Sequence, residues 1–260
     1  MMGLKMRASL RTVLVTGAAQ RIGRAVALDL ARHGWSVAVH YRSDEAAARE
    51  LGDRIRELGV HVALLRADLG REDETSALVE RAAAELGPLT CLVNNASAFE
   101  PDVAQAVTRV SWDLHLETNL RAPFVLIQHF ARQLPSDANG SVINFIDQRV
   151  WNLTPFFTSY TVSKSGLWTL TRTLALALAP RIRVNAIGPG PALKSARQTQ
   201  EDFERQCAST PLGRGTAPEE ICDAVRFILG APAMTGQMIA LDGGQHLGWA
   251  HPQGSSVPRE

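Results

Sequence analysis

The chain has 260 residues, of which 45% are hydrophobic and 20% are charged, so it can bury a sizeable sheet beneath helices. Its 27 basic residues are balanced by 26 acidic ones, which excludes the basic excess that nucleic-acid binding needs. No apolar signal segment follows Met1 to Arg11, and no run approaches the roughly 18 apolar residues of a membrane span. We therefore expect a cytoplasmic protein that binds neither nucleic acid nor a membrane.

Short β-branched runs alternate with longer helical patterns, which is typical of repeated βαβ units. The sequence predicts seven strands, at 12–16, 36–41, 61–66, 90–94, 141–146, 182–187 and 237–241. It predicts helices at 22–33, 44–58, 72–86, 109–134, 158–179 and 217–229, most with apolar residues three and four apart. The expected fold class is α/β, a doubly wound Rossmann-type fold with a seven-stranded parallel sheet and helices on both faces.

No internal repeat or linker divides this alternation, so residues 1–260 are expected to form a single domain. Two segments fall outside the pattern. The loop at about 188–215, with a short helical piece at 199–208, would leave the carboxyl end of a strand, where doubly wound sheets bind ligands. We interpret it as a substrate loop. The tail 245–260 is expected to fray unless a partner subunit covers it.

A glycine-containing turn, Thr16 to Gly23, connects the first predicted strand to the first predicted helix. Gly17 and Gly23 allow the backbone to pass close to a pyrophosphate, and the helix that begins near Ile22 offers free N–H groups and a positive dipole end. The alternative is an ordinary turn with incidental glycines. The position of the Thr16–Gly23 turn between a predicted strand and a predicted helix favours the dinucleotide site over this alternative.

The second strand ends in His40, Tyr41, Arg42 and Ser43, where an NAD enzyme would offer an acidic residue to the ribose. Arg42, Ser43 and His40 would instead attract a 2′-phosphate, so we expect NADP as the cofactor. Asp44 fits the N-terminus of the next helix better than a ribose contact.

Tyr160 and Lys164 lie four residues apart at the start of a predicted helix, and therefore on one face of it. A nearby ammonium lowers the pKa of a phenol, so Tyr160 could give a proton to a substrate as hydride arrives. An exposed Tyr–Lys pair is the alternative. The phosphate turn and the Asn94-Asn95-Ala96 turn after the fourth strand favour the catalytic interpretation.

Together these motifs resemble the short-chain dehydrogenase/reductase family over residues 12–244. The resemblance implies that Asn119 supports a proton-relay water beside Lys164. It also implies that further cofactor contacts come from Asp68, Leu69, Asn95, Ala96, Ser97, Pro189 and Gly190. Asp68 could equally serve as a helix cap. Arg21 stands where the family usually has the middle glycine of its phosphate turn, and could contact phosphates or the substrate or only face solvent.

Asp147 stands thirteen residues before Tyr160, where the family normally has a serine that donates to a carbonyl oxygen. An ionised carboxylate cannot donate and would repel the oxyanion of a reduced ketone. An aspartate beside Tyr160 would suit protonation of a ring nitrogen instead.

Asp147, Arg21 and the segment Asn94 to Phe99 resemble those of pteridine reductases and the related dihydromonapterin/dihydrofolate reductases. By that resemblance Phe99 would stack on the pterin, Ser97 would hydrogen-bond it, and Arg21 would reach its polar edge. The expected activity is hydride transfer from NADPH to a pterin or dihydropteridine, with Tyr160 and Asp147 as proton donors. Phe99 as core filling is the alternative.

Two other functions stay open: a short-chain carbonyl reductase acting on a 3-oxoacyl thioester or a sugar, and a non-catalytic NADP-binding sensor. The seven histidines show no ligand spacing, so no metal is expected. The helices predicted at 109–134 and 158–179 match those that pair between subunits in the family, which implies a homotetramer.

Overall fold

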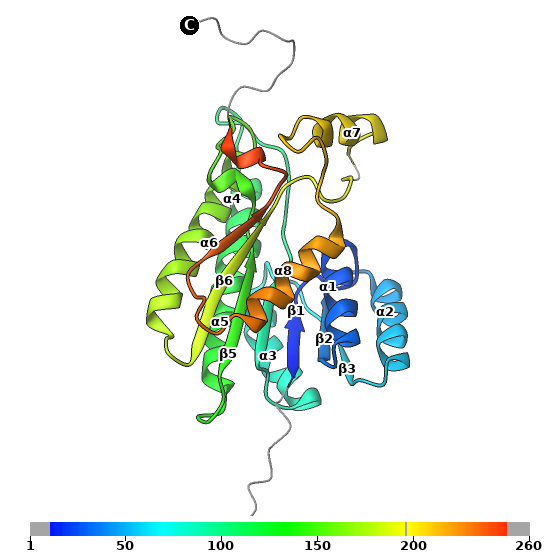
Figure 1. Cartoon of the computed structure of the whole chain (residues 1–260). Helices are drawn as coiled ribbons and strands as arrows, with labels where there is room; N and C mark the ends of the chain where they lie inside the picture. Colours follow the sequence, from blue (N-terminus) through cyan, green and yellow to red (C-terminus); the bar gives the residue numbers. More distant parts are fainter. Residues whose placement is uncertain (1–10, 196, 249–260) are drawn as a thin grey trace, which may run out of the picture.

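The computed structural model describes residues 11–195 and 197–248, in which strands and helices alternate as predicted (Figure 1). The strands are β1 (Thr12–Val15), β2 (Ser36–Tyr41), β3 (Val62–Arg66), β4 (Cys91–Asn94), β5 (Gly140–Phe145), β6 (Ile182–Pro189) and β7 (Met238–Leu241). The α-helices are α1 (Arg21–Arg32), α2 (Glu45–Glu57), α3 (Glu72–Leu86), α4 (Arg109–Leu116), α5 (Ala122–Gln133), α6 (Thr158–Ala177), α7 (Gln200–Ala208) and α8 (Pro218–Gly230). Shorter turns are η1 (Glu117–Arg121), η2 (Gln148–Val150) and η3 (Gln245–Leu247).

The strands form one sheet in the order β3-β2-β1-β4-β5-β6-β7, and every pairing is parallel. Val13 of β1 lies between Val37 of β2 and Cys91 of β4. The sheet and its flanking helices confirm the predicted fold class.

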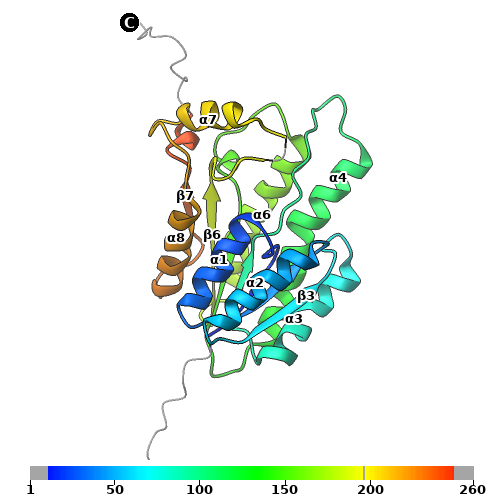
Figure 2. The same cartoon turned by 90° about the vertical axis from the view of Figure 1, so that its right-hand side faces the viewer.

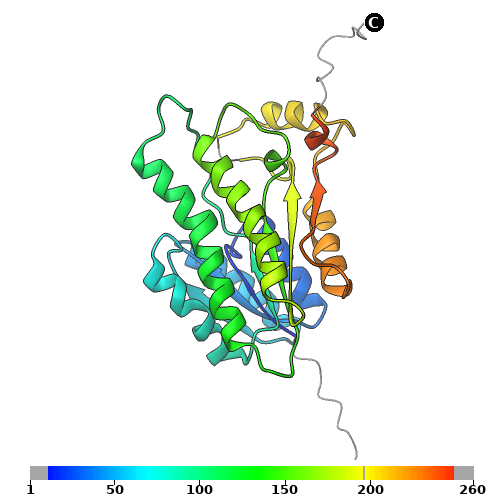
Figure 3. The ribbon, with the colours of Figure 1, turned by 90° about the vertical axis from the view of Figure 1, so that its left-hand side faces the viewer.

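Helices cover both faces of the sheet, and successive strand residues point to opposite faces. Val13 and Val15 pack in a core with α1, α2 and α8, whereas Leu14 packs on the other side with α3 and α5. Figure 2 shows α1, α2 and α8 together, and Figure 3 shows α6 alongside the α4–α5 column. Apolar burial on both faces explains why the strands read as short, nearly continuous apolar runs.

The strand order reverses between β1 and β4, and ligands of such sheets bind at the carboxyl ends of the strands beside that reversal. In Figure 3 the arrowheads of β6 (yellow) and β7 (orange) point toward α7, which lies in the predicted substrate loop. The helical piece predicted at 199–208 is therefore confirmed as α7.

The helix predicted over 109–134 is interrupted, which corrects the sequence analysis. It consists of α4, the π-helical turn η1 and α5. Pro123 stands in the first turn of α5 and has no N–H to bond the carbonyl of Asn119 four residues earlier. A π-helical turn accommodates that missing bond, and such turns are frequent at functional sites.

The predicted tail begins with η3, but residues 249–260 lie outside the described residues. Among the residues that the structure describes, no helix has the length and apolar character needed to cross a membrane.

Candidate active site

The phosphate turn between β1 and α1 depends on its two glycines. Gly17 has φ 62°, which residues with a side chain rarely adopt. A Cβ on Gly23 would lie 2.3 Å from the carbonyl oxygen of Gly17, so a side chain there would break the turn. Ile22 is half-buried in the first turn of α1. The turn thus brings backbone and a helix N-terminus to one point, as a bound phosphate requires.

Arg21 has φ 54°, the left-handed conformation that a glycine would adopt easily. Its guanidinium donates to the carbonyl oxygens of Leu193 at 2.8 Å and Lys194 at 2.7 Å. Arg21 therefore connects the phosphate turn to the predicted substrate loop. Its contact with phosphate or substrate stays a prediction.

His40 lies beneath the phosphate turn, and its position corrects the expectation that it attracts a phosphate. The side chain is 2% exposed. The Gly17 N–H donates to its Nδ1 at 3.0 Å, and its Nε2 faces the carbonyl oxygen of Ala67 at 3.1 Å. This pattern assigns a neutral ring protonated at Nε2. Burial lowers the pKa of His40 to about 4, so the ring supports the turn without charge.

Arg42 and Ser43 are exposed just beyond β2, while Tyr41 is buried. No described residue hydrogen-bonds the Arg42 guanidinium. Arg66, which was not among the residues predicted from the sequence, ends β3 and donates to the Arg42 carbonyl oxygen at 3.3 Å. The parallel pairing of β2 with β3 brings both arginines to the same sheet edge. Asp44 accepts the N–H of Ala47 at 2.9 Å and caps α2, as predicted.

The turn after β4 is tied to the phosphate turn. The Asn95 side chain donates to the Thr16 carbonyl oxygen at 2.8 Å, and the N–H groups of Asn95 and Ala96 donate to the Thr16 hydroxyl at 3.0 Å. Asp68 accepts the N–H of Gly70 at 2.9 Å, and Leu69 is buried. Asp68 therefore caps a turn, whereas the N-cap position of α3 belongs to Arg71.

Tyr160 and Asp147 are in direct contact. The Tyr160 hydroxyl donates to Asp147 Oδ2 at 2.9 Å. Tyr160 lies in the first turn of α6, and Asp147 follows the β5 segment directly before η2. Lys164, one turn further along α6, is buried and donates to the Phe145 carbonyl oxygen at 2.8 Å. The predicted Asp–Tyr–Lys group is therefore assembled at the carboxyl end of β5.

The pKa of Tyr160 corrects the sequence analysis, which expected Lys164 to lower it. Burial, followed by the charge of Asp147, raises the pKa of Tyr160 well above its usual value. Arg149 and a hydrogen bond with Ser97 lower it and oppose these larger effects. Burial also lowers the pKa of Lys164 to about 8. In this arrangement the phenol keeps its proton and can act as a donor.

Asn119 lies in η1 with its side chain fully buried. Its Oδ1 accepts the N–H of Ala98 at 2.8 Å and the Ser97 hydroxyl at 3.2 Å. Its Nδ2 donates to the Ala98 carbonyl oxygen at 2.9 Å and to Ser163 Oγ at 3.1 Å. Asn119 thus fixes the segment that carries Ser97 relative to the α6 residues beside Lys164.

An aromatic group lies beside the Tyr160 side chain. The Phe99 ring stacks on Phe157, with centroids 4.5 Å apart, and meets the Tyr160 ring edge-on at 4.7 Å. Arg149 lies against both phenylalanine rings, and Arg197 lies against Phe99 and pairs with Glu100. Sequence reasoning missed Phe157, Arg149 and Arg197. Phe157 is the left-handed N-cap of α6 and reaches the site through Phe99, so helical spacing from Tyr160 gave no signal for it.

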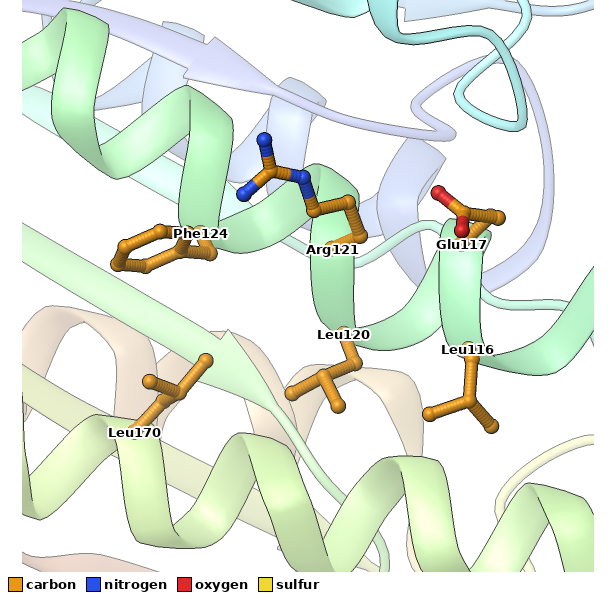
Figure 4. Close-up of a pocket in the computed structure, with 6 residues that line it drawn as sticks. All are labelled: Leu116, Glu117, Leu120, Arg121, Phe124 and Leu170. Carbon is orange, nitrogen blue, oxygen red and sulfur yellow. The ribbon is translucent and has the colours of Figure 1, made fainter. Parts of the chain in front are cut away.

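Pro189 ends β6, and Gly190 lies against β7, where a Cβ would meet the Asp242 Cα at 2.7 Å. A separate apolar pocket lies away from this group, between η1 and α6 (Figure 4). It is lined by Leu116, Glu117, Leu120, Arg121, Phe124 and Leu170. Within residues 11–195 and 197–248, no group of three or more His, Cys, Asp or Glu side chains could hold a metal ion.

The parallel sheet, glycine turn and Tyr–Lys pair define a dinucleotide-dependent oxidoreductase, and the chain belongs to the short-chain dehydrogenase/reductase family. The family model described as enoyl-(acyl carrier protein) reductase matches residues 17–246. This confirms the predicted family and enzyme class.

Two solved structures are similar over nearly the whole chain. FolM alternative dihydrofolate reductase 1 from Brucella suis, in complex with NADP, is 49% identical with a TM-score of 0.90, covering 93% of this chain and 97% of that one. The Brucella canis protein of the same name, also complexed with NADP, is 48% identical with a TM-score of 0.90, covering 93% and 96%. Among curated relatives, 3-oxoacyl-[acyl-carrier-protein] reductase FabG from Staphylococcus aureus is 32% identical over 244 residues, covering 91% of this chain and 98% of the relative. The predicted cofactor agrees with the two NADP complexes.

Proposed function

We propose that this chain is an NADPH-dependent reductase of a pterin or dihydropteridine, in which Tyr160 donates the proton and the Asp147 carboxylate, expected from the sequence to donate as well, accepts from Tyr160 and orients it. The observation that carries this proposal is the 2.9 Å hydrogen bond from the Tyr160 hydroxyl to Asp147. A carboxylate repels the oxyanion that forms when a ketone is reduced, but it stabilises a ring nitrogen that gains a proton. The pair therefore suits reduction of a carbon–nitrogen double bond.

The residues of the phosphate turn fit a dinucleotide, because a Cβ at Gly23 would fill the space under the turn. Those proposed to hold NADP are Gly17, Arg21, Ile22, Gly23, Tyr41, Arg42, Ser43, Asp68, Leu69, Asn95, Ala96, Ser97, Tyr160, Lys164, Pro189 and Gly190. When bound, NADPH supplies the hydride. Arg42, with Arg66 beside it, provides positive charge for the 2′-phosphate that distinguishes NADPH from NADH.

The substrate is proposed to lie beside Phe99, with Ser97 hydrogen-bonded to it and Arg21 near its polar edge. Phe99 supports this, because its ring meets Tyr160 edge-on at 4.7 Å, so a flat heterocycle nearby would lie within reach of the proton donor. Tyr160 gives its proton to the ring nitrogen while the adjacent carbon receives hydride. Asp147 keeps the phenol oriented, and Asn119 and Lys164 hold the surrounding backbone.

The similarity to the two FolM proteins, which are named dihydrofolate reductases, supports a pterin substrate. The similarity to FabG favours the carbonyl alternative. Asp147 argues against that alternative, because it stands where carbonyl-reducing members of the family have a serine that donates to the oxygen.

The test is a substrate panel. Purified protein is assayed for NADPH oxidation with dihydrobiopterin, dihydromonapterin, dihydrofolate and an acetoacetyl thioester. Turnover of at least one dihydropteridine, with little turnover of the thioester, is the expected result. Turnover of the thioester alone would replace the proposal with a carbonyl reductase. NADPH binding without turnover of any of them would favour a sensor.

A further inference from the structure

We propose that Arg149 binds the substrate directly, through the edge of its guanidinium formed by Nε and Nη2; this inference rests on the proposed function. Arg149 lies in η2, two residues after Asp147. Its Nη1 donates at 2.9 Å to Asp147 Oδ2, the same oxygen that accepts the Tyr160 hydroxyl. Its backbone N–H donates to Asp147 Oδ1 at 2.8 Å. The guanidinium is therefore held beside the proton donor.

The opposite edge of that guanidinium has donors without acceptors. Nε is buried and has no hydrogen-bond partner among the residues that the structure describes. No described residue accepts from Nη2 either. The N–H bonds of Nε and Nη2 point the same way and form a fork that can donate to the two lone pairs of one oxygen or to two neighbouring acceptors. Because buried donors are almost always paired, this fork indicates an acceptor that arrives with a ligand.

The fork lies next to the aromatic group proposed to hold the substrate. The guanidinium carbon of Arg149 is 5.5 Å from the Phe99 ring centroid and 5.4 Å from that of Phe157. Its side chain is 19% exposed, so solvent competes weakly for the donors. An arginine in this position would bind a group presented at the edge of a stacked heterocycle.

A dihydropteridine presents such an edge. Its 4-carbonyl oxygen has two lone pairs and can accept both donors of the fork, while the neighbouring N5 is left to receive the proton from Tyr160. An analogue with a 4-amino group would place a donor against the fork instead. Arg149 is thereby assigned as a residue that selects 4-oxo over 4-amino heterocycles.

The experiment measures binding of a 4-oxo pterin and its 2,4-diamino analogue to the protein with NADP⁺ bound, by fluorescence titration. The variants are Arg149→Met, Arg149→Lys and the control Arg172→Met. Arg172 also stacks on an aromatic ring, Trp168, but at an exposed position of α6. The quantity compared between variants is the ratio of the two ligand affinities. Any difference between the ligands that does not involve Arg149 affects this ratio equally in every variant.

In the wild type and Arg172→Met, the 4-oxo ligand should be favoured. In Arg149→Met that preference should fall by roughly tenfold or more, the usual worth of a hydrogen bond to a charged group. Arg149→Lys keeps the charge but lacks the fork, so it should also lose the preference. NADPH affinity should be unchanged in all four proteins. If Arg149→Met fails to fold, Arg149→Lys carries the test.

An unchanged preference in the Arg149 variants, in a protein that reduces dihydropteridines, would overturn the inference and leave the proposed function standing. Arg149 would then serve only to hold Asp147. A wild type that turns over no dihydropteridine would refute the proposed function and this inference with it. The panel and the titration therefore distinguish the two failures.

Discussion

Replacing Asp147 by alanine removes three contacts at once: the 2.9 Å hydrogen bond from Tyr160, the 2.9 Å ion pair with Arg149 and the 2.8 Å hydrogen bond from the Arg149 backbone N–H. Asp147 orients Tyr160, and a positioned acid contributes roughly 10²-fold to 10⁴-fold to a rate. We expect kcat on a dihydropteridine to fall by about 10²-fold or more, which corresponds to about 2.7 kcal/mol of transition-state stabilisation. NADPH affinity should hardly change, because the described contacts of Asp147 do not include the phosphate turn.

The pH profile gives an independent measure. Tyr160 is active as a proton donor only while it is protonated, so activity should decline at a pH set by its pKa. The charge of Asp147 raises that pKa, and its loss should lower it. In Asp147→Asn, which keeps the shape but not the charge, the decline at high pH should therefore begin at lower pH than in the wild type.

The assay is steady-state NADPH oxidation with a dihydropteridine and with an acetoacetyl thioester. Asp147→Ser supplies a hydroxyl that can donate to an oxyanion, so carbonyl reduction should rise while pterin reduction falls. These opposite signs are the decisive readout. If the alanine and serine variants both keep wild-type pterin turnover, Asp147 is a structural turn residue and the reasoning is refuted.

Three further predictions concern the cofactor, the assembly and folding. NADPH should bind at least about tenfold more tightly than NADH, about 1.4 kcal/mol, and Arg42→Ala should reduce the difference; equal affinities in a fluorescence titration would contradict this. Light scattering at micromolar concentration should show a homotetramer, with the apolar pocket of Figure 4 as a candidate contact, and a monomer would disprove it. Because the pKa of His40 falls from 6.5 to about 4 on folding, its contribution to stability is complete above pH 6.5 and declines as the pH falls toward 4. Denaturant unfolding should show a loss of about 3 kcal/mol at pH 4 from this group, absent in His40→Asn.

Apolar periodicity and glycine placement were sufficient to predict the sheet and most helices, because both faces of the strands are buried. The single long helix predicted over 109–134 was wrong, since periodicity does not register the π-helical turn that Pro123 accompanies. The spacing of Tyr160, Lys164 and Asp147 predicted that they meet. This worked because α6 and the end of β5 are adjacent in any sheet of this order.

The remaining errors concern burial and contacts between loops. His40 lies at a strand end, and its sequence neighbours give no sign that it turns inward to support Gly17. Arg149 lies in a short turn that has no repeating pattern of apolar residues, so the sequence does not indicate where the Arg149 side chain points. The pKa of Tyr160 depends on how deeply the phenol is buried, which a spacing of four residues does not specify.

Arg21 connects two segments, the phosphate turn and the loop that carries Leu193 and Lys194. Its backbone shapes the turn proposed to hold the pyrophosphate, while its side chain grips the carbonyl groups of Leu193 and Lys194. A shift in one of these segments is therefore transmitted to the other. By thermodynamic reciprocity, if a bound cofactor favours the observed position of residues 188–195, that position raises cofactor affinity by the same factor. If the phosphate turn binds the dinucleotide as proposed, Arg21 therefore couples occupancy of that turn to the position of Leu193 and Lys194 in the loop proposed to receive the substrate.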